Sequence, residues 1–141
     1  MMPETRKRRF GDRYDGWRLR HTQSFFSVMP HIMKRRSDSS VLFDDVVEIE
    51  ELEKYVRRLR RDENMPGFSM FHLFIAASVR MITLRPWLNR FVVGGKTYAR
   101  NRLTISMTVK RSLSKDAEEV VIKPDFEGTD TVFDVYRKIN G

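Results

Sequence analysis

Residues 68–93 read FSMFHLFIAASVRMITLRPWLNRFVV, and this stretch decides the fold. Apolar side chains recur in it at three- and four-residue spacing, which predicts a helix over 68–84 with Ser69 as its N-cap. Apolar residues also occupy the other faces, so we expect the helix to be covered on all sides. Pro86 prevents the helix from continuing. With Arg80 inside it, and a length of about 17 residues, the segment is better explained as a core helix than as a membrane span.

The rest of the chain alternates between helix and strand signals around this helix. The sequence VLFDDVVEI at 41–49 is rich in β-branched and aromatic residues and predicts a strand. Gly94 and Gly95 separate two apolar runs and predict a hairpin. Before the central helix, the sequence predicts a helix up to about Met29 that Pro30 ends, an irregular segment through Arg36, a turn at 37–40 and an amphipathic helix with the stripe Ile49, Leu52, Val56 and Leu59. After the hairpin, it predicts a strand at 103–110, a polar loop at 112–118, a strand at 120–123 and a C-terminal helix that begins at 129–131.

Composition restricts the class of protein. A chain of 141 residues with 40% hydrophobic and 33% charged residues is long enough for one domain with its own core. The absence of cysteine excludes disulfides, a thiolate zinc site and a cysteine nucleophile. No apolar segment follows the basic N-terminus as a signal peptide would require, so a cytoplasmic location is the default expectation.

Positive charge is concentrated near the N-terminus. The net charge is +8, and residues 1–20 hold seven Arg and Lys against three acidic residues. We therefore divide the chain into a basic flexible arm, 1–16, and a folded part, 17–141. The arm could bind nucleic acid, an acidic partner or an acidic cofactor, but a solvated tail that keeps the protein soluble is the favoured interpretation.

The sequence by itself contains no complete active site. His21, His31 and His72 have no metal-ligand spacing, so we predict no metal site. His72 lies within the apolar helix, where a hydrogen-bonded core histidine is more common than a catalytic one. The GGKT sequence at 94–97 is not a phosphate-binding loop, because position 90 holds Arg where that motif needs Gly.

The order of these elements resembles the CoA-dependent acyltransferase superfamily, which comprises chloramphenicol acetyltransferase and the acyltransferase domain of 2-oxo acid dehydrogenase complexes. FHLFIAASVRMITLRPWLN is similar to a family helix that carries spaced alanines and is followed by Pro and Asn, to which Pro86 and Asn89 correspond. WRLRHTQSFF is similar to W-x-x-R-x-x-x-x-F-Y of the chloramphenicol branch. The residues that match this second motif are Trp17, Arg20, Phe25 and Phe26.

The resemblance implies a fold and an activity. The implied fold is an α/β two-layer sandwich with a mixed sheet, of which the chain spans only the N-terminal portion. The implied activity moves an acyl group between CoA and a small acceptor, with dihydrolipoamide favoured because the central helix looks more like the dehydrogenase branch. By the same resemblance, Phe25 and Phe26 are acceptor-pocket candidates, although two core aromatics explain them equally well.

The sequence differs from the family pattern at the residue that acts as the general base. Its H-x-x-x-D motif is absent: four residues after His21, His31 and His72 stand Phe25, Arg35 and Ala76. We therefore assign no catalytic residue, and we expect the chain to end before the motif. The implied partners are further copies in a trimer and components of a dehydrogenase complex.

Three functions follow as hypotheses. The first is an acyltransferase-type domain that uses acyl-CoA and a lipoyl acceptor. The second is a non-catalytic oligomerisation module of the same fold, and the third is nucleic-acid or acidic-partner binding through the arm. An incomplete sandwich exposes an apolar surface or a sheet edge, so we also expect the isolated chain to oligomerise or aggregate.

Overall fold

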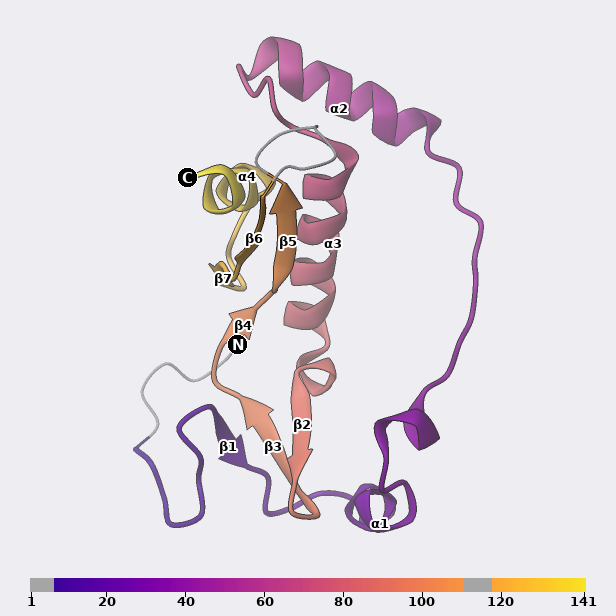
Figure 1. Cartoon of the computed structure of the whole chain (residues 1–141), viewed down its shortest axis with the longest axis vertical. Coiled ribbons are helices and arrows are strands. Elements are labelled where there is room, and N and C mark those ends of the chain that lie inside the picture. Colours follow the sequence, from indigo (N-terminus) through magenta and orange to yellow (C-terminus); the bar gives the residue numbers. More distant parts are fainter. Residues whose placement is uncertain (1–6, 111–117) are drawn as a thin grey trace. The chain divides into compact units, whose positions relative to one another are not determined.

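The computed structural model describes residues 7–110 and 118–141, apart from the side chain of Arg36. Within them the protein is a mixed α/β structure with four α-helices and small antiparallel sheets (Figure 1). The chain divides into two compact units. Unit 1 contains the described residues up to Ile49 together with Arg85–Asn101, and unit 2 contains Glu50–Leu84 and Arg102–Gly141. The mixed α/β class predicted from the sequence is confirmed.

Unit 1 is built on a three-stranded sheet. Strands β1 and β2 both pair antiparallel with β3, which lies between them. The β2–β3 hairpin turns at Gly94 and Gly95, whose φ angles of 56° and 69° suit glycine, as predicted. In chain order the elements are β1 (Gly16–Arg18), α1 (Ser24–Ile32), the 3-10 helix η1 (Arg36–Ser39), the 3-10 helix η2 (Pro86–Leu88), β2 (Arg90–Val93) and β3 (Lys96–Arg100).

Unit 2 contains the long helices and two small sheets. Strand β4 pairs with β7, and β5 pairs with β6. The predicted strand at 103–110 is interrupted, because Ile105 and Ser106 lie between β4 and β5. In chain order the elements are α2 (Glu50–Asp62), α3 (Met70–Leu84), β4 (Leu103–Thr104), β5 (Met107–Lys110), β6 (Glu119–Ile122), β7 (Asp125–Phe126) and α4 (Val132–Asn140).

Two hydrophobic clusters hold unit 2 together. In the first, Ile75 and Val79 of α3 pack with Leu103 of β4, Met107 of β5 and Val135 of α4. The second lies between α2 and the start of α3, and its buried members are Val56, Leu59, Met65 and Phe68. The helices form where local signals predicted them. Helix α4 begins at a capping box in which Thr131 accepts the backbone N–H of Asp134 and Asp134 accepts the backbone N–H of Thr131.

Two predictions about the central helix and its surroundings are wrong. Helix α3 is not covered on all sides, since Phe71, Phe74, Met81 and Leu84 are 45%, 69%, 51% and 60% exposed. The stretch 41–49 is not a strand, because among the described residues no neighbouring strand pairs with it. The composition of a strand does not suffice, since a strand exists only when a second one completes its hydrogen bonds.

The N-terminal part of the folded region also differs from the prediction. Trp17 lies in β1, where it pairs with Ala99, and the helix that was predicted to run up to about Met29 begins at Ser24. The helix passes Pro30 and continues to Ile32. Proline removes the backbone donor that would bond to the carbonyl of Phe26, and the helix ends two residues later. The expected turn at 37–40 is present as η1 and its C-cap, and the predicted polar loop falls mostly outside the described residues.

The sandwich of a single mixed sheet stays a prediction. The described strand pairs are all antiparallel and belong to three separate small sheets. None of the helices in the described part of the chain has both the length and the apolar character needed to cross a membrane.

Candidate functional site

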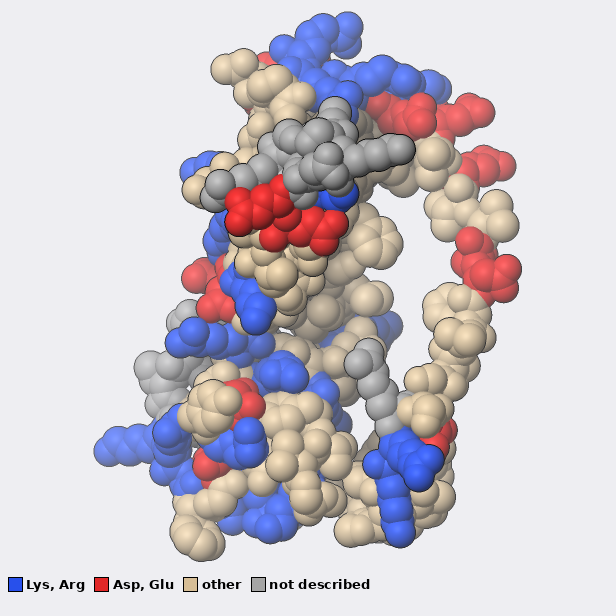
Figure 2. Space-filling view, viewed as in Figure 1, with Lys and Arg blue, Asp and Glu red and all other residues tan. Residues whose placement is uncertain are grey.

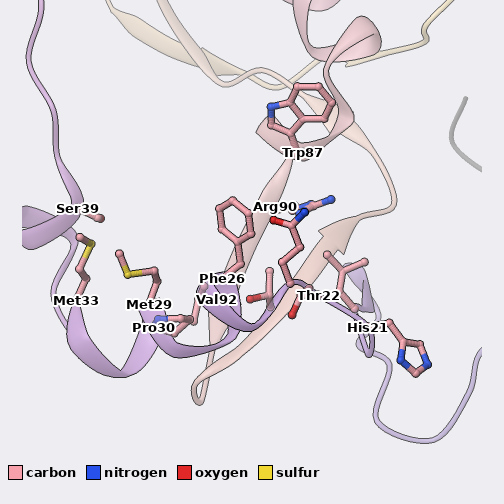
Figure 3. Close-up of a pocket in the computed structure, with 13 residues that line it drawn as sticks. His21, Thr22, Phe26, Met29, Pro30, Met33, Ser39, Trp87, Arg90 and Val92 are labelled. Atoms are coloured by element: carbon pink, nitrogen blue, oxygen red, sulfur yellow. The ribbon is translucent and has the colours of Figure 1, made fainter.

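A pocket of about 660 Å³ lies within unit 1. It forms between the side of α1 that carries Phe26 and Met29, the C-cap residue Met33, one face of the β2–β3 hairpin, and η2 (Figure 3). Phe26 and Met29 are three residues apart and lie on one side of the helix. The full lining is Leu19, His21, Thr22, Gln23, Phe26, Met29, Pro30, Met33, Ser39, Trp87, Arg90, Val92 and Thr97.

The sheet of unit 1 has two different faces. Arg90 and Val92 are two residues apart on β2, so they share the face that lines the pocket, together with Thr97, which is paired with Val92. On the opposite face, the rings of Phe91 and Tyr98 stack with centroids 5.4 Å apart. One face is therefore closed by aromatic packing, and the other borders an open cavity.

The walls of the pocket are mainly apolar, and their side chains are incompletely buried. Phe26 and Trp87 are each 52% exposed, so a ligand that entered between them would cover apolar surface of both. Removal of this apolar surface from water would contribute favourably to the binding free energy of the ligand. Pockets of this kind usually accept small molecules with an apolar body.

One permanent charge borders this apolar space. Arg90 is the only Lys or Arg in the lining, which contains no carboxylate. Figure 3 shows that the ring of His21 is directed away from Phe26 and Trp87. The arrangement suits a ligand with an apolar part and, at one end, an acceptor or an anion that a guanidinium can bind.

The two acceptor-pocket candidates are separated by the structure. Phe26 lines the pocket and Phe25 does not, although their rings meet edge to face with centroids 5.7 Å apart. Neighbouring residues on a helix point about 100° apart, so only one of them can face the cavity. Phe25 is 64% exposed. Neither residue belongs to a buried core.

The other motif residues support the frame of unit 1 and do not line the pocket. Trp17 pairs with Ala99 across the β1–β3 ladder. The guanidinium of Arg20 donates to the backbone carbonyl of Phe10 at 2.5 Å. Pro86 begins η2, and Asn89 caps it by donating its backbone N–H to the carbonyl of Pro86 at 3.1 Å. Pro86 and Asn89 therefore define the two ends of the short helix η2 that carries Trp87.

The described part of the basic arm contacts the sheet. The guanidinium of Arg13 donates to Asp15 at 2.8 Å and lies over the rings of Phe91 and Tyr98. This contact lowers the pKa of Asp15 and raises that of Arg13. Figure 2 shows Lys and Arg side chains spread over unit 1 with acidic ones between them. Arg13 therefore has a structural role, and nothing about its geometry indicates nucleic acid.

His72 belongs to the core of unit 2, as the sequence favoured. Its Nδ1 accepts the backbone N–H of Ser69 at 3.1 Å and lies 2.9 Å from the Ser69 hydroxyl, while Nε2 lies 3.1 Å from the side-chain amide of Asn140. Its ring stacks on Phe68 and contacts Tyr136. Burial lowers the pKa of His72, because the charged imidazolium is poorly solvated there. Both ring nitrogens are engaged, so this residue is not available to a substrate.

His31 packs on the β2–β3 turn. A Cβ atom added at Gly95 would lie 2.8 Å from the Cε1 atom of this imidazole. The contact joins α1 to the hairpin and explains why glycine is required there for space as well as for its φ angle. In the described residues, no group of three or more His, Asp or Glu side chains could hold a metal ion.

No match exists among known families. The chain matches no family model, no curated protein and no solved structure. The resemblance to acyltransferases therefore rests on the quoted motifs alone.

Sequence reasoning missed most of the pocket. The spacing of Phe26, Met29 and Met33 could have indicated one wall, but Pro30 between them suggested that the helix ended. Trp87 and Arg90 lie some sixty residues further along the chain. Only the folding of η2 and the hairpin against α1 brings them to the same cavity.

Proposed function

We propose that the pocket of unit 1 binds a small amphipathic acyl acceptor of the dihydrolipoamide class, as the acceptor side of an acyltransferase-type site. One observation carries this proposal: Phe26, which the family resemblance assigns to the acceptor pocket, lines a cavity of about 660 Å³. That cavity has a size typical of small-molecule sites.

The chemistry of the lining supports an acceptor of this kind. Dihydrolipoamide has a flexible hydrocarbon chain with two thiols at one end and an amide at the other. The hydrocarbon would lie against Phe26, Met29 and Trp87, and the amide oxygen would accept a hydrogen bond from Arg90.

Acyl transfer would also require a donor and a base. The family resemblance implies acyl-CoA as donor, a two-layer sandwich as the complete fold and a trimer as the assembly. The acceptor thiol becomes an effective nucleophile when a base removes its proton. This sequence has no H-x-x-x-D motif, and His72 is committed to the core of unit 2. We therefore propose that residues 1–141 bind the acceptor and that the base lies outside them.

The test is a titration of the full chain with reduced lipoamide. Binding is detected by calorimetry and by NMR of the methionine methyl groups. We expect saturable binding, with shifts for Met29 and Met33. Phe26→Ala should weaken binding about tenfold or more, because a wall of the cavity is removed. Phe25→Ala is the matched control, since it removes the same side chain from the next position and should leave the affinity nearly unchanged.

A second measurement examines the role of Arg90. Dihydrolipoate, which carries a carboxylate in place of the amide, should bind more tightly than dihydrolipoamide, and Arg90→Gln should abolish that preference. No binding of either compound, or equal losses in the two phenylalanine variants, would contradict the proposed acceptor site. Acyl transfer by the purified chain alone would show that the base is present in it and would contradict that part of the proposal.

A further inference from the structure

Helix α1 carries a stripe of apolar side chains on the side that does not line the pocket. Phe25, Val28 and Ile32 follow one another at spacings of three and four residues, so they lie along one side of the helix. They are 64%, 49% and 67% exposed. The pocket takes Phe26 and Met29 from the same helix and none of these three residues. The helix is therefore apolar on two sides, and one of these sides lies in solvent.

Basic residues follow this helix directly. Lys34, Arg35 and Arg36 come after its C-cap residue, and residues 16–37 contain two further arginines and no acidic residue. Lys34 and Arg35 are exposed, and among the described residues neither forms an ion pair with a carboxylate. In Figure 2, Lys and Arg side chains gather over the part of the chain that Figure 1 labels α1. The exposed apolar stripe therefore borders a group of positive charges.

No described part of the same chain covers this surface. The acidic residue nearest in sequence to the basic group, Asp38, uses its carboxylate to accept the backbone N–H of Arg35 at 3.0 Å. The apolar residues that come next, Val41, Leu42 and Phe43, are 85%, 96% and 88% exposed, so they do not pack on α1. The apolar and the basic half of the surface both remain available to a partner.

A second copy of the chain does not suit this surface. In a symmetric dimer the same patch of both copies meets, so Lys34 and Arg35 of one copy would approach those of the other. Like charges that face each other across an interface weaken it. The net charge of +8 on each copy adds to this repulsion. The charge instead favours an anionic partner.

A bilayer that contains anionic lipids matches both halves of the surface. The apolar side chains of an interfacial helix enter the boundary between headgroups and acyl chains, and basic residues beside them stay at the level of the anionic headgroups. Such binding needs neither a groove that fits the helix nor carboxylates at fixed positions. An acidic protein would have to provide both.

We infer that the outer side of α1 and the basic residues after it bind the surface of a bilayer that contains anionic lipids. Phe25, Val28 and Ile32 enter the interface, and Lys34 and Arg35 bind lipid phosphates. No segment has to cross the bilayer. The inference does not depend on the acceptor pocket, whose lining includes none of these five residues.

Co-sedimentation of the full chain with vesicles tests the inference. We expect binding to vesicles of phosphatidylcholine mixed with phosphatidylglycerol, little binding to phosphatidylcholine alone, and weaker binding as the salt concentration rises. Phe25→Ala should weaken the binding about tenfold, because apolar surface is lost from the interface. Phe26→Ala, which alters the pocket side of the same helix, is the matched control and should have little effect. Equal binding to the two kinds of vesicle, or equal losses in the two variants, would overturn the inference.

A pair of double variants separates the basic group from the net charge of the chain. Lys34→Gln with Arg35→Gln should weaken binding about 30-fold, since each basic residue near an anionic surface contributes about fivefold. Arg57→Gln with Arg58→Gln makes the same change in net charge on α2. An equal loss in this control would attribute binding to net charge and would overturn the inference.

Insertion of the helix is measured with a polarity-sensitive fluorophore on an introduced cysteine, since the natural chain has none. Val28→Cys places it on the exposed stripe, and Ser27→Cys is the control, because neighbouring residues of a helix point about 100° apart. We expect anionic vesicles to shift the emission to shorter wavelength at position 28 and much less at position 27. Equal shifts at the two positions would overturn the inference. So would binding of polyglutamate through Lys34 and Arg35 without binding of vesicles, because it would identify an acidic protein as the partner.

Discussion

The two units of this chain differ in how much apolar surface they bury. Among the described residues, every buried hydrophobic side chain except Tyr98 belongs to unit 2. Unit 1 instead contains a pocket with half-exposed apolar walls and the exposed segment 41–49. Since burial of apolar surface is the main driving force of folding, unit 2 should be held by its own core. Unit 1 should gain proportionally more from a ligand or a partner.

The largest effect should come from the core of unit 2. The ring of Phe68 is fully buried and lies between His72 and Tyr136, with centroid distances of 5.4 and 5.9 Å. We expect Phe68→Ala to lower the free energy of unfolding by about 3–5 kcal/mol, because it leaves a cavity. Phe26→Ala in unit 1 should change it by no more than about 0.5 kcal/mol. Urea denaturation measures both, and a similar loss in the two variants would invalidate the contrast between the units.

A second prediction concerns the buried histidine of unit 2. His72→Gln should cost about 1–3 kcal/mol, because the backbone N–H of Ser69 loses its acceptor. His21→Gln, at an exposed histidine, is the control and should be nearly neutral. The same unfolding curves at several pH values give a further, independent readout.

The pH dependence follows from the lowered pKa of His72. Its folded-state pKa lies below the ordinary value of 6.5, so the unfolded chain binds more protons in the interval between the two values. The stabilisation is therefore complete above about pH 6.5 and is lost as the pH falls from there towards the folded-state pKa. His72→Gln should flatten this part of the profile. An unchanged slope would mean that burial of His72 does not control it.

A third, smaller effect should appear in unit 1. Gly94→Ala meets no atom within 4 Å and pays only for its positive φ angle, about 1–2 kcal/mol. Gly95→Ala pays a similar backbone cost and also meets the ring of His31. We expect the second variant to be less stable than the first, and His31→Ala to remove the difference in a double-mutant cycle. Additive effects would show that His31 does not support the hairpin.

Local signals explain which parts of the fold were predictable. The α3 periodicity, the Gly94–Gly95 turn and the start of the last helix at 129–131 each depend on signals within a few residues, and each element is found where it was predicted. Residues 41–49 have the composition of a strand, but strand formation requires a distant partner that composition does not reveal. The exposed flank of α3 was missed for the same reason, since apolar residues on all faces do not determine what covers them.

The candidate site was less predictable than the fold. The resemblance drew attention to two adjacent phenylalanines, but only the helix geometry distinguishes Phe26 from Phe25. Trp87 and Arg90 carry no motif that would mark them as pocket residues, because a pocket is defined by the approach of separate segments. His72 was correctly assigned to the core, since a single polar residue in an apolar helix usually finds local hydrogen-bond partners.

The smallest predicted effect concerns the N-terminus of α4 in unit 2. Thr131→Ala removes the hydroxyl that accepts the N–H of Asp134 and should cost about 1 kcal/mol, whereas Thr129→Ala, outside the capping box, should cost little. Hydrogen bonds from Thr131 and an ion pair with Arg137 lower the pKa of Asp134 to about 2. The carboxylate therefore stabilises the fold above about pH 4, and its contribution is lost as the pH falls from there to 2. Acid unfolding of Thr131→Ala should show a weaker dependence on pH in this interval, because the main cause of the lowered pKa is gone. If the cap variant and the Thr129 control lost stability equally, the helix would be held by the packing of Val135 alone, and the core of unit 2 would explain even more of the difference from unit 1.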